Sequence, residues 1–369
     1  MTDDDDENED DLGMKKLRIG ILSTAGIGQK NWKAIFHSGN CIVAAVASRD
    51  LAKSLSFIEE LQREFAFTET PRAFGSYEEL IASPTVDAVY VPLPTGLRKK
   101  YVLLATQAGK HILCEKPCAA STAELDEMLA ACQQQNVQFL DGVMFMHNPR
   151  LEKIRAALDD EKSIGKIQRI SSAFSFQNGE AFFRSNIRVQ HSLEPAGCLG
   201  DLGWYCIRLT LWALHWQLPH SVSAKILQQS ADGTPTEFPA EMLFTDGVSA
   251  GFYCSFVAAK QQWAVISGRQ GTLSLPDFVH PRNGYEPAFE LNERSMVTAT
   301  GAPCPAGADP ADYGHAMAQD TQMFRNFANQ IFSGQRNPHW PRWARQTQLV
   351  LDACLIAGRT GNPVVLPPI

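Results

Sequence analysis

The sequence predicts an α/β protein with an N-terminal doubly wound parallel sheet and a C-terminal α+β domain that carries a large, mostly antiparallel open sheet. Two patterns predict this fold class. Up to about residue 145, nearly continuous apolar runs alternate with amphipathic stretches, as expected for parallel strands covered by helices on both faces. Beyond that point, apolar and polar residues alternate beside glycine turns, which is typical of antiparallel strands with one packed face. The length of 369 residues fits two domains.

The first part contains five apolar runs that we expect to be strands. They cover residues 17–23, 41–48, 86–92, 111–114 and 137–140. Amphipathic segments between them predict helices at residues 27–37, 50–65 and 97–108. Two more helices are expected to begin at Ser76 and Ser121, because each serine stands three residues before a glutamate and so forms a capping box.

The second part changes to a period of two. Strands are expected at residues 167–176, 248–256, 264–267 and 272–275, with a glycine-bounded turn between the last two. Two helices, at about 319–332 and 341–357, are expected to close the chain. The segment 285–313 is rich in proline, glycine and alanine and supports no assignment.

These patterns divide the chain into a disordered acidic leader (1–14), a first domain (15–145) and a second domain (146–369) whose terminal helices pack back on the first. The net charge is −7, and eight acidic residues between Asp3 and Asp11 account for it, because the remainder would carry +1. A near-neutral body argues against a surface that follows nucleic-acid phosphates, so no nucleic acid is expected as a partner.

Other classes of protein are also disfavoured. No run of 18 apolar residues occurs, so no membrane span is expected. The chain opens with acidic residues rather than the basic patch and apolar run of a secretory signal. The nine cysteines form no CxxC pair and the histidines no HExxH motif, which predicts no metal site and reduced thiols in the cytoplasm.

Small residues follow the first expected strand and precede a helix. The segment Ser23, Ala25, Gly26, Ile27, Gly28 is a softened form of the glycine-rich turn that binds a dinucleotide. Such a turn lets backbone N–H groups approach a pyrophosphate at a helix N-terminus. An ordinary strand–helix turn is the alternative interpretation.

The residues after the second expected strand indicate which dinucleotide would bind. Ser48 and Arg49 stand there, where sites that prefer NAD usually place an acidic residue for the ribose 2′-hydroxyl. A hydroxyl and a guanidinium fork suit a 2′-phosphate, so NADP is preferred over NAD. Two alternatives stay open: a helix-start serine beside a solvated arginine, or Asp50 turned towards a ribose.

Glu115, Lys116 and Pro117 follow the fourth expected strand, at the edge where open α/β sheets bind ligands. A lysine there can polarise a carbonyl oxygen or stabilise a developing alkoxide. A surface lysine at a strand end is the alternative, and three residues alone would favour it.

Longer segments resemble the Gfo/Idh/MocA family of oxidoreductases. The resemblance rests on residues 86–94, 109–117, 141–144, 183–184, 197–205 and 352–364. It implies a nicotinamide-dependent dehydrogenase with a Rossmann domain and a second α/β domain whose open sheet forms oligomer contacts. It also implies that Lys116 is the catalytic lysine and that Asp201 and Tyr205 are the Asp-x-x-x-Tyr pair of sugar and dihydrodiol dehydrogenases.

The same resemblance extends to residues around the substrate and cofactor. The loop Pro92, Leu93, Thr95 would line the nicotinamide ribose, together with Glu115. Phe183, Arg184 and His147 are candidate substrate contacts. The run Phe145–Pro149 departs from the family pattern, so His147 is also open to interpretation as a structural histidine.

The residues themselves support this chemistry. Asp201 and Tyr205 are four apart, so on a helix both project from one face. A nearby Lys116 ammonium would stabilise the phenolate and lower the pKa of Tyr205 towards useful acid–base chemistry. A partly buried aromatic beside Trp204 and Trp212 is the alternative.

The expected function is hydride transfer between nicotinamide C4 and a secondary alcohol or carbonyl of a sugar, polyol or dihydrodiol. Tyr205 would exchange the hydroxyl proton, Lys116 would hold the oxygen, and Asp201 would orient the substrate or Lys116. Two alternatives are a non-catalytic nucleotide-sensing regulator, and redox-assisted elimination or glycoside hydrolysis with cofactor recycling. The expected partners are a small-molecule substrate and further copies of the chain, in a dimer or tetramer built through the C-terminal sheet.

Overall fold

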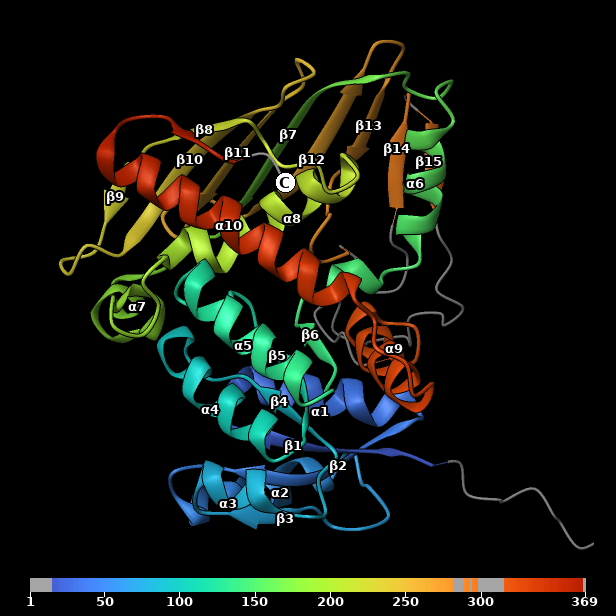
Figure 1. Cartoon of the computed structure of the whole chain (residues 1–369), viewed down its shortest axis with the longest axis vertical. Helices are drawn as coiled ribbons and strands as arrows, with labels where there is room; N and C mark the ends of the chain where they lie inside the picture. Colours follow the sequence, from blue (N-terminus) through green and yellow to red (C-terminus); the bar gives the residue numbers. More distant parts are fainter. Residues whose placement is uncertain (1–14, 282–287, 293, 298–314, 368–369) are drawn as a thin grey trace, which may run out of the picture.

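The computed structural model describes residues 15–281, 288–292, 294–297 and 315–367. In Figure 1 a small parallel sheet lies at the bottom and a large sheet at the top, with helices between them. The expected acidic leader, residues 1–14, lies outside the described residues, as does most of the unassigned segment 285–313.

The smaller sheet has six parallel strands in the order β3-β2-β1-β4-β5-β6. Their bounds are β1 Leu17–Leu22, β2 Cys41–Ala47, β3 Arg72–Phe74, β4 Ala88–Val91, β5 His111–Cys114 and β6 Phe139–Asp141. The strand order reverses between β1 and β4, and ligands of doubly wound sheets bind in the crevice at such a switch point. The predicted doubly wound sheet is confirmed.

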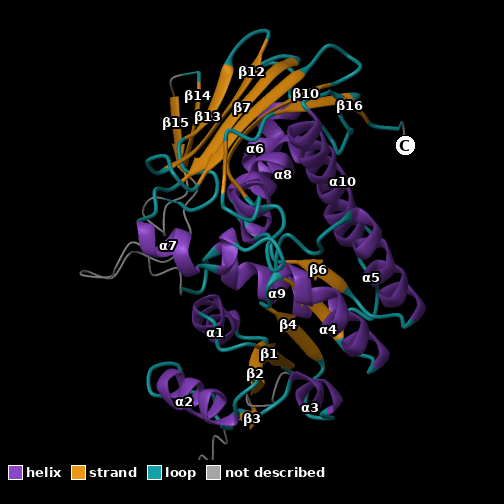
Figure 2. Cartoon of the chain, turned by 90° about the vertical axis from the view of Figure 1, so that its left-hand side faces the viewer, coloured by secondary structure: helices purple, strands orange, loops and turns teal. Residues whose placement is uncertain are grey.

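Helices cover both faces of this sheet. They are α1 Gly26–Ser38, α2 Leu51–Gln62, α3 Tyr77–Ala82, α4 Thr95–Gln107 and α5 Thr122–Gln134. In Figure 2, α1 and α2 lie on one side of the strands and α3, α4 and α5 on the other. Both predicted capping boxes form: the Ser76 hydroxyl accepts the Glu79 N–H at 3.1 Å, and the Ser121 hydroxyl accepts the Glu124 N–H at 3.3 Å.

The larger sheet has the order β15-β14-β13-β12-β7-β11-β10-β8-β16, and β9 pairs with β10. Its strands are β7 Ile167–Ser175, β8 Ser221–Ala224, β9 Gln228–Gln229, β10 Pro235–Leu243, β11 Ser249–Ser255, β12 Gln261–Gly268, β13 Thr272–Leu275, β14 Ala288–Leu291, β15 Arg294–Val297 and β16 Val364–Val365. All pairs are antiparallel except β7 with β11. The prediction of a large, mostly antiparallel sheet is therefore confirmed.

In the described residues of the second part, short turns and five helices complete the fold. They are η1 Met144–His147, α6 Arg150–Asp159, α7 Glu180–Ser185, η2 Ile187–Val189, the π-helical turn η3 Leu199–Gly203, α8 Trp204–Ala213, α9 Gln319–Phe332 and α10 His339–Thr360. Helix α10 contacts α5 and β6 as well as α8 and β8, and α9 packs on α1 and η1. These terminal helices therefore join the two sheets, as Figure 1 shows for α10.

Polar contacts also connect the two parts. Asp141 at the end of β6 forms a buried ion pair with Arg208 of α8. Lys30 of α1 pairs with Asp320 of α9 at 2.9 Å, and Thr122 donates from its backbone N–H to Asp352 at 2.6 Å. These contacts fix the crevice between the sheets. Among the described residues, no helix is long and apolar enough to cross a membrane.

Candidate active site

A cavity of about 440 Å³ opens between the two parts of the molecule, and we call it the interlobe cavity. Residues from the first part that line it include Ala25, Gly26, Ile27, Pro92, Leu93, Glu115 and Lys116. Residues from the second part that line it include Phe174, Phe176, Ile187, Arg188, Asp201 and Tyr205. The cavity therefore brings the expected dinucleotide turn to the three residues expected to be catalytic.

Lys116 and Asp201 form an ion pair across the cavity. Lys116 follows β5, and its Nζ lies 2.7 Å from Asp201 Oδ1 and 2.6 Å from the Asp201 carbonyl oxygen. Arg188 approaches the other carboxylate oxygen, with Nε 2.9 Å from Oδ2. Burial raises the pKa of Asp201, but the Lys116 and Arg188 charges outweigh burial and hold that pKa well below its usual value. Asp201 is therefore a carboxylate that positions two cations.

Tyr205 lies beside Lys116 but is not activated by it. The Lys116 ammonium lies 4.7 Å from the Tyr205 ring centroid, over the ring, and the phenol O–H donates to Met144 Sδ at 3.5 Å. Burial, together with the negative charges of Glu115 and Asp201, raises the pKa of Tyr205 well above its ordinary value. The expectation of a lowered pKa is wrong for this arrangement, because burial of the phenol and the nearby carboxylates outweigh the effect of the neighbouring cations.

The backbone between Asp201 and Tyr205 explains their proximity. Asp201 lies in the π-helical turn η3 and Tyr205 in the first turn of α8, and both side chains line the interlobe cavity. π-Helical turns are rare and occur frequently at functional sites. Gly200 lets this turn approach the first part closely, since a Cβ there would lie 3.1 Å from Pro117 Cγ. The predicted shared face is observed, although the turn that creates it is wider than an α-helical one.

The start of α1 fits a dinucleotide pyrophosphate. Ser23 accepts the Ala25 N–H at 3.0 Å, which shapes the turn, and Ala25 provides no side-chain cap to the helix. Ala25, Gly26 and Ile27 line the cavity, and a Cβ at Gly26 would meet no atom within 4 Å. Gly28 lies behind them in the first turn of α1. The Gly28 N–H donates to the Ala25 carbonyl at 2.7 Å, and the helix start at Gly26 borders open space, which suits an anion at a helix N-terminus.

The residues after β2 were expected to contact the cofactor ribose, either through Arg49 or through Asp50. Asp50 is the N-cap of α2, and its Oδ1 accepts the Ala52 N–H at 3.0 Å. The buried Ser48 hydroxyl accepts the Asp50 N–H at 3.3 Å. Arg49 is exposed between them. One Asp50 oxygen is used for the cap, which favours the exposed guanidinium of Arg49 as the group that contacts a ribose substituent.

Thr95 and the three expected substrate contacts also lie outside the lining of the interlobe cavity. Thr95 is buried at the start of α4, where its N–H and hydroxyl both donate to Glu194, at 3.0 and 2.6 Å. Phe183 and Arg184 lie on α7, where Phe183 packs on Phe182 and Arg184 pairs with Glu180 at 2.7 Å. His147 lines a different cavity, and neither Phe183 nor Arg184 lines the interlobe cavity, so the structure does not bring these three expected substrate contacts to the Lys116 site.

Sequence reasoning missed several groups in the interlobe cavity. Arg188, Glu194 and the Lys30–Asp320 pair all line it. Arg188 and Glu194 come from irregular segments, where no spacing pattern marks them. Tyr90 does not line the cavity, but its hydroxyl donates to Glu115 Oε1 at 2.6 Å, and a phenol in an otherwise aliphatic strand, beside a strand that a glutamate follows, is a detectable signal. Among the described residues, no cluster of histidine, cysteine and acidic side chains could hold a metal ion.

Two family models match the sequence. The oxidoreductase family model with an NAD-binding Rossmann fold, GFO_IDH_MocA, covers residues 17–143, and the GFO/IDH/MocA C-terminal domain model covers residues 151–274. The D-xylose 1-dehydrogenase (NADP(+)) 2 of Haloferax volcanii is 30% identical over 77% of this chain and 83% of its own. The trans-1,2-dihydrobenzene-1,2-diol dehydrogenase of Mus musculus is 31% identical over 70% of this chain and 74% of its own.

Solved structures have the same fold. KijD10, a 3-ketoreductase from Actinomadura kijaniata in complex with NADP, superposes with a TM-score of 0.80 at 22% identity, covering 93% of this chain and 98% of its own. A levoglucosan dehydrogenase in complex with NADH and levoglucosan superposes with a TM-score of 0.79 at 18% identity, covering 96% and 100%. With the sequence matches, these findings establish that the chain belongs to the Gfo/Idh/MocA family of oxidoreductases with an NAD-binding Rossmann fold.

Proposed function

We propose that this protein is an NADP-dependent dehydrogenase or reductase that transfers a hydride between nicotinamide C4 and a secondary alcohol or carbonyl of a sugar, polyol or dihydrodiol. The observation that carries the proposal is the meeting of Lys116, Asp201 and Tyr205 in a cavity that also reaches the start of α1. The names of the xylose and dihydrodiol dehydrogenase relatives support the substrate classes.

Each of the three residues has a distinct role in this proposal. The bound nicotinamide supplies or accepts the hydride. Lys116 contacts the reacting oxygen, and its ammonium stabilises negative charge there. Tyr205 is protonated at neutral pH, because its pKa is raised, and donates its proton to the carbonyl oxygen during reduction. Asp201 holds the Lys116 ammonium in place through the 2.7 Å contact.

Cofactor preference is assigned to Arg49. Arg49 is exposed just after β2, and one oxygen of the neighbouring Asp50 carboxylate accepts the Ala52 N–H as the α2 cap. The guanidinium fork matches a phosphate dianion, which supports NADP. Pro92, Leu93 and Glu115 line the cavity and are proposed to contact the nicotinamide half. Thr95 is proposed to act through the start of α4 rather than by direct contact, because its polar atoms bind Glu194.

Three further proposals concern the whole chain. We propose domain limits of 15–145 and 146–369, which agree with the separate sheets at 17–141 and 167–365. We propose a homo-oligomer built through the face of the large sheet that, in Figure 2, no helix of the described chain covers. We propose a cytoplasmic location, supported by eight cysteines that are buried and free among the described residues.

The direct test follows NADPH absorbance across a panel of aldoses, ketoses, polyols and vicinal diketones. We expect turnover of at least one class, and a loss of about 10²–10⁴-fold in kcat/KM for Lys116→Met. Lys99→Met is the matched control, because Lys99 is an exposed lysine that pairs with Glu127 at 2.8 Å away from the cavity. Turnover that survives Lys116→Met unchanged would refute the proposed role of Lys116.

A further inference from the structure

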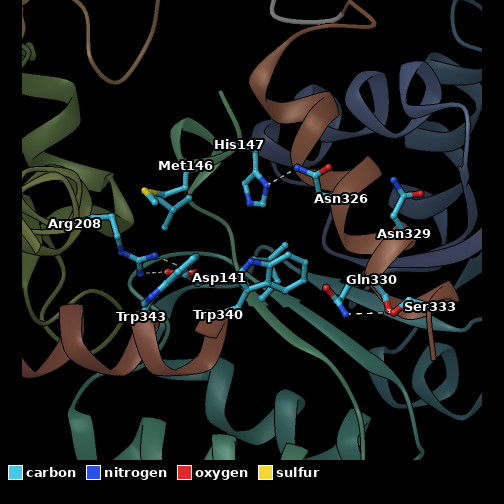
Figure 3. A pocket seen from close by; sticks show the side chains of 12 residues that line it. Asp141, Met146, His147, Arg208, Asn326, Asn329, Gln330, Ser333, Trp340 and Trp343 are labelled. Carbon is cyan, nitrogen blue, oxygen red and sulfur yellow. Dashed lines mark hydrogen bonds and ion pairs between the residues drawn. The ribbon is translucent and has the colours of Figure 1, made fainter. Parts of the chain in front are cut away.

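The turn η1 contributes to two separate cavities. Met144, at its start, lines the interlobe cavity, whereas Met146 and His147 line a second cavity of about 480 Å³ (Figure 3). Elements β6, η1, α8, α9 and α10 enclose this second space, which we call the α9–α10 cavity. None of the residues proposed for hydride transfer lines it.

Two tryptophans of α10 form rigid aromatic walls of the α9–α10 cavity. Trp340 is buried, with 8% of its surface exposed, and its ring centroid lies 6.1 Å from that of His147 in an edge-on arrangement. Trp343 is stacked on Trp216, with centroids 4.6 Å apart and planes 7° from parallel. Figure 3 shows the His147 ring directed towards the Trp340 indole. The indoles are held in place by packing, so they offer a preformed apolar surface.

The α9–α10 cavity presents no uncompensated charge. Arg208 and Asp141 lie at one side of it, but they pair with each other and their side chains are 1% and 3% exposed. Arg208 also donates to the Thr347 hydroxyl at 2.8 Å. Burial lowers the pKa of His147 to about 4, so the imidazole is neutral at physiological pH. An anionic ligand would therefore find no free cation among the lining residues.

The rim of this cavity offers hydrogen-bond donors and acceptors in alternation. Asn326 Nδ2 lies 3.1 Å from His147 Nδ1, so in the neutral imidazole Nδ1 accepts and Nε2–H remains a donor. Asn329 uses Oδ1 to accept from Asn40 at 2.8 Å, which leaves its NH₂ group. Gln330 uses Nε2 to donate to the Gln335 carbonyl at 3.0 Å, which leaves Oε1 as an acceptor. Asn326 Oδ1 is a second acceptor.

We propose that the α9–α10 cavity is a binding site for a neutral, polyhydroxylated small molecule of the size of a monosaccharide or cyclitol. A hydroxyl both donates and accepts, so it matches a rim of mixed amides better than an anion or a hydrocarbon does. The C–H face of such a ring packs on the indole of Trp340, and the volume lies within the range of small-molecule sites. This inference does not depend on the proposed hydride transfer.

The test measures binding to the full-length chain by calorimetry, with D-glucose, D-xylose and myo-inositol as probes. All proteins carry Lys116→Met, so that turnover does not interfere. We expect at least one probe to bind this protein, and to bind about tenfold or more weakly after Asn326→Ala and Gln330→Ala are added together. Gln134→Ala is the matched control, because Gln134 is an exposed amide at the end of α5. It should leave binding unchanged.

The stability of the variants and the competition by phosphate also test whether the α9–α10 cavity binds a sugar. Asn326 and Gln330 lie on the outer surface of α9, and the unfolding midpoint of each variant checks that the fold is kept. If the double variant unfolds, Gln330→Ala alone is expected to weaken binding by several-fold. The proposal is overturned if no probe binds, if the rim variants bind as well as the control, or if inorganic phosphate displaces the sugar.

Discussion

At the scale of single residues, Asp201 decides how charge is arranged in the interlobe cavity. Its carboxylate contacts Lys116 through Oδ1 and Arg188 through Oδ2. Lys116 is nearly buried, with 10% of its side chain exposed, so it needs this counter-charge more than a surface lysine would. The Lys116 ammonium is therefore stabilised by the second part of the molecule.

We expect Asp201→Asn to lower the free energy of unfolding at pH 7 by about 2 kcal/mol, because two cations lose a counter-charge. The pKa of Asp201 is lower in the folded than in the unfolded chain, so the carboxylate stabilises the fold above about pH 4. The difference between wild type and variant should therefore shrink as the pH falls below that value. Urea unfolding at a series of pH values measures this. A pH-independent difference would contradict the electrostatic explanation.

Tyr205 has its own pH prediction. Because the pKa of Tyr205 is raised well above its ordinary value, the phenol stays protonated throughout the neutral and mildly alkaline range. The kcat/KM for carbonyl reduction should therefore show no loss from Tyr205 ionisation below about pH 10. Tyr205→Phe should lower kcat by about 10²-fold or more while NADPH still binds. An alkaline decline near pH 7 that disappears in Tyr205→Phe would show that the phenol ionises early.

At the scale of elements, we expect two adjacent residues in the loop between β2 and α2, Arg49 and Asp50, to have different functions. Arg49→Ala should weaken NADP binding by about tenfold or more and NAD binding much less, because only NADP carries the 2′-phosphate. Asp50→Ala should instead lower stability by about 1 kcal/mol through the lost cap, with little change in either cofactor. Cofactor titrations and thermal unfolding of both variants separate these effects. Equal losses of NAD and NADP in Arg49→Ala would refute the 2′-phosphate assignment.

Most elements of the first sheet were predictable because burial on both faces makes each strand a continuous apolar run. The strand β3, Arg72–Phe74, was missed because it is a three-residue edge strand with one exposed and two half-buried residues. The strand β10 was missed for a different reason: it opens with Pro235 and carries Glu237 and Glu241, which conceal the alternating buried residues. Local patterns identify central strands better than edges and strands with polar faces.

The same limit applies to the site. Lys116, Asp201 and Tyr205 could be singled out because the family resemblance covers the segments that contain them, and the structure places all three in one cavity. Their tertiary partners could not, since the contact of Arg188 with Asp201 depends on how η2 meets η3 rather than on spacing. The cavity that His147 lines could not be predicted for a related reason. It is three residues from Met144, yet the tight turn η1 directs the two side chains into different cavities.

At the scale of the whole molecule, the uncovered face of the large sheet is suited to self-association. Four residues on neighbouring strands are paired in register and form a row across the sheet. They are Trp263 of β12, Ala173 of β7, Tyr253 of β11 and Pro239 of β10. Trp263 is 37% exposed, which is unusual for a large aromatic residue. Tyr253 and Pro239 in this row are half-buried and Ala173 is buried, so Trp263 is the apolar side chain that projects most from this face, and we expect it to contact a second copy of the chain.

We therefore expect the full-length chain to be a dimer or larger by light scattering, and Trp263→Glu to dissociate it by placing a charge in the interface. Leu55→Glu is the control, because Leu55 is an exposed apolar residue on α2, far from the sheet. A monomeric wild type, or a Trp263→Glu variant that associates as strongly as Leu55→Glu, would exclude this face as the interface.

The central claim is that the interlobe cavity brings Lys116 and Tyr205 to a carbon that exchanges hydride with nicotinamide. The most direct measurement uses NADPH deuterated at C4 with the carbonyl panel and determines the mass of each alcohol formed. The account predicts an alcohol that carries one deuterium at the former carbonyl carbon with the wild-type protein, and almost none with Lys116→Met. A wild-type protein that binds NADPH tightly but transfers deuterium to no carbonyl of the panel would contradict it.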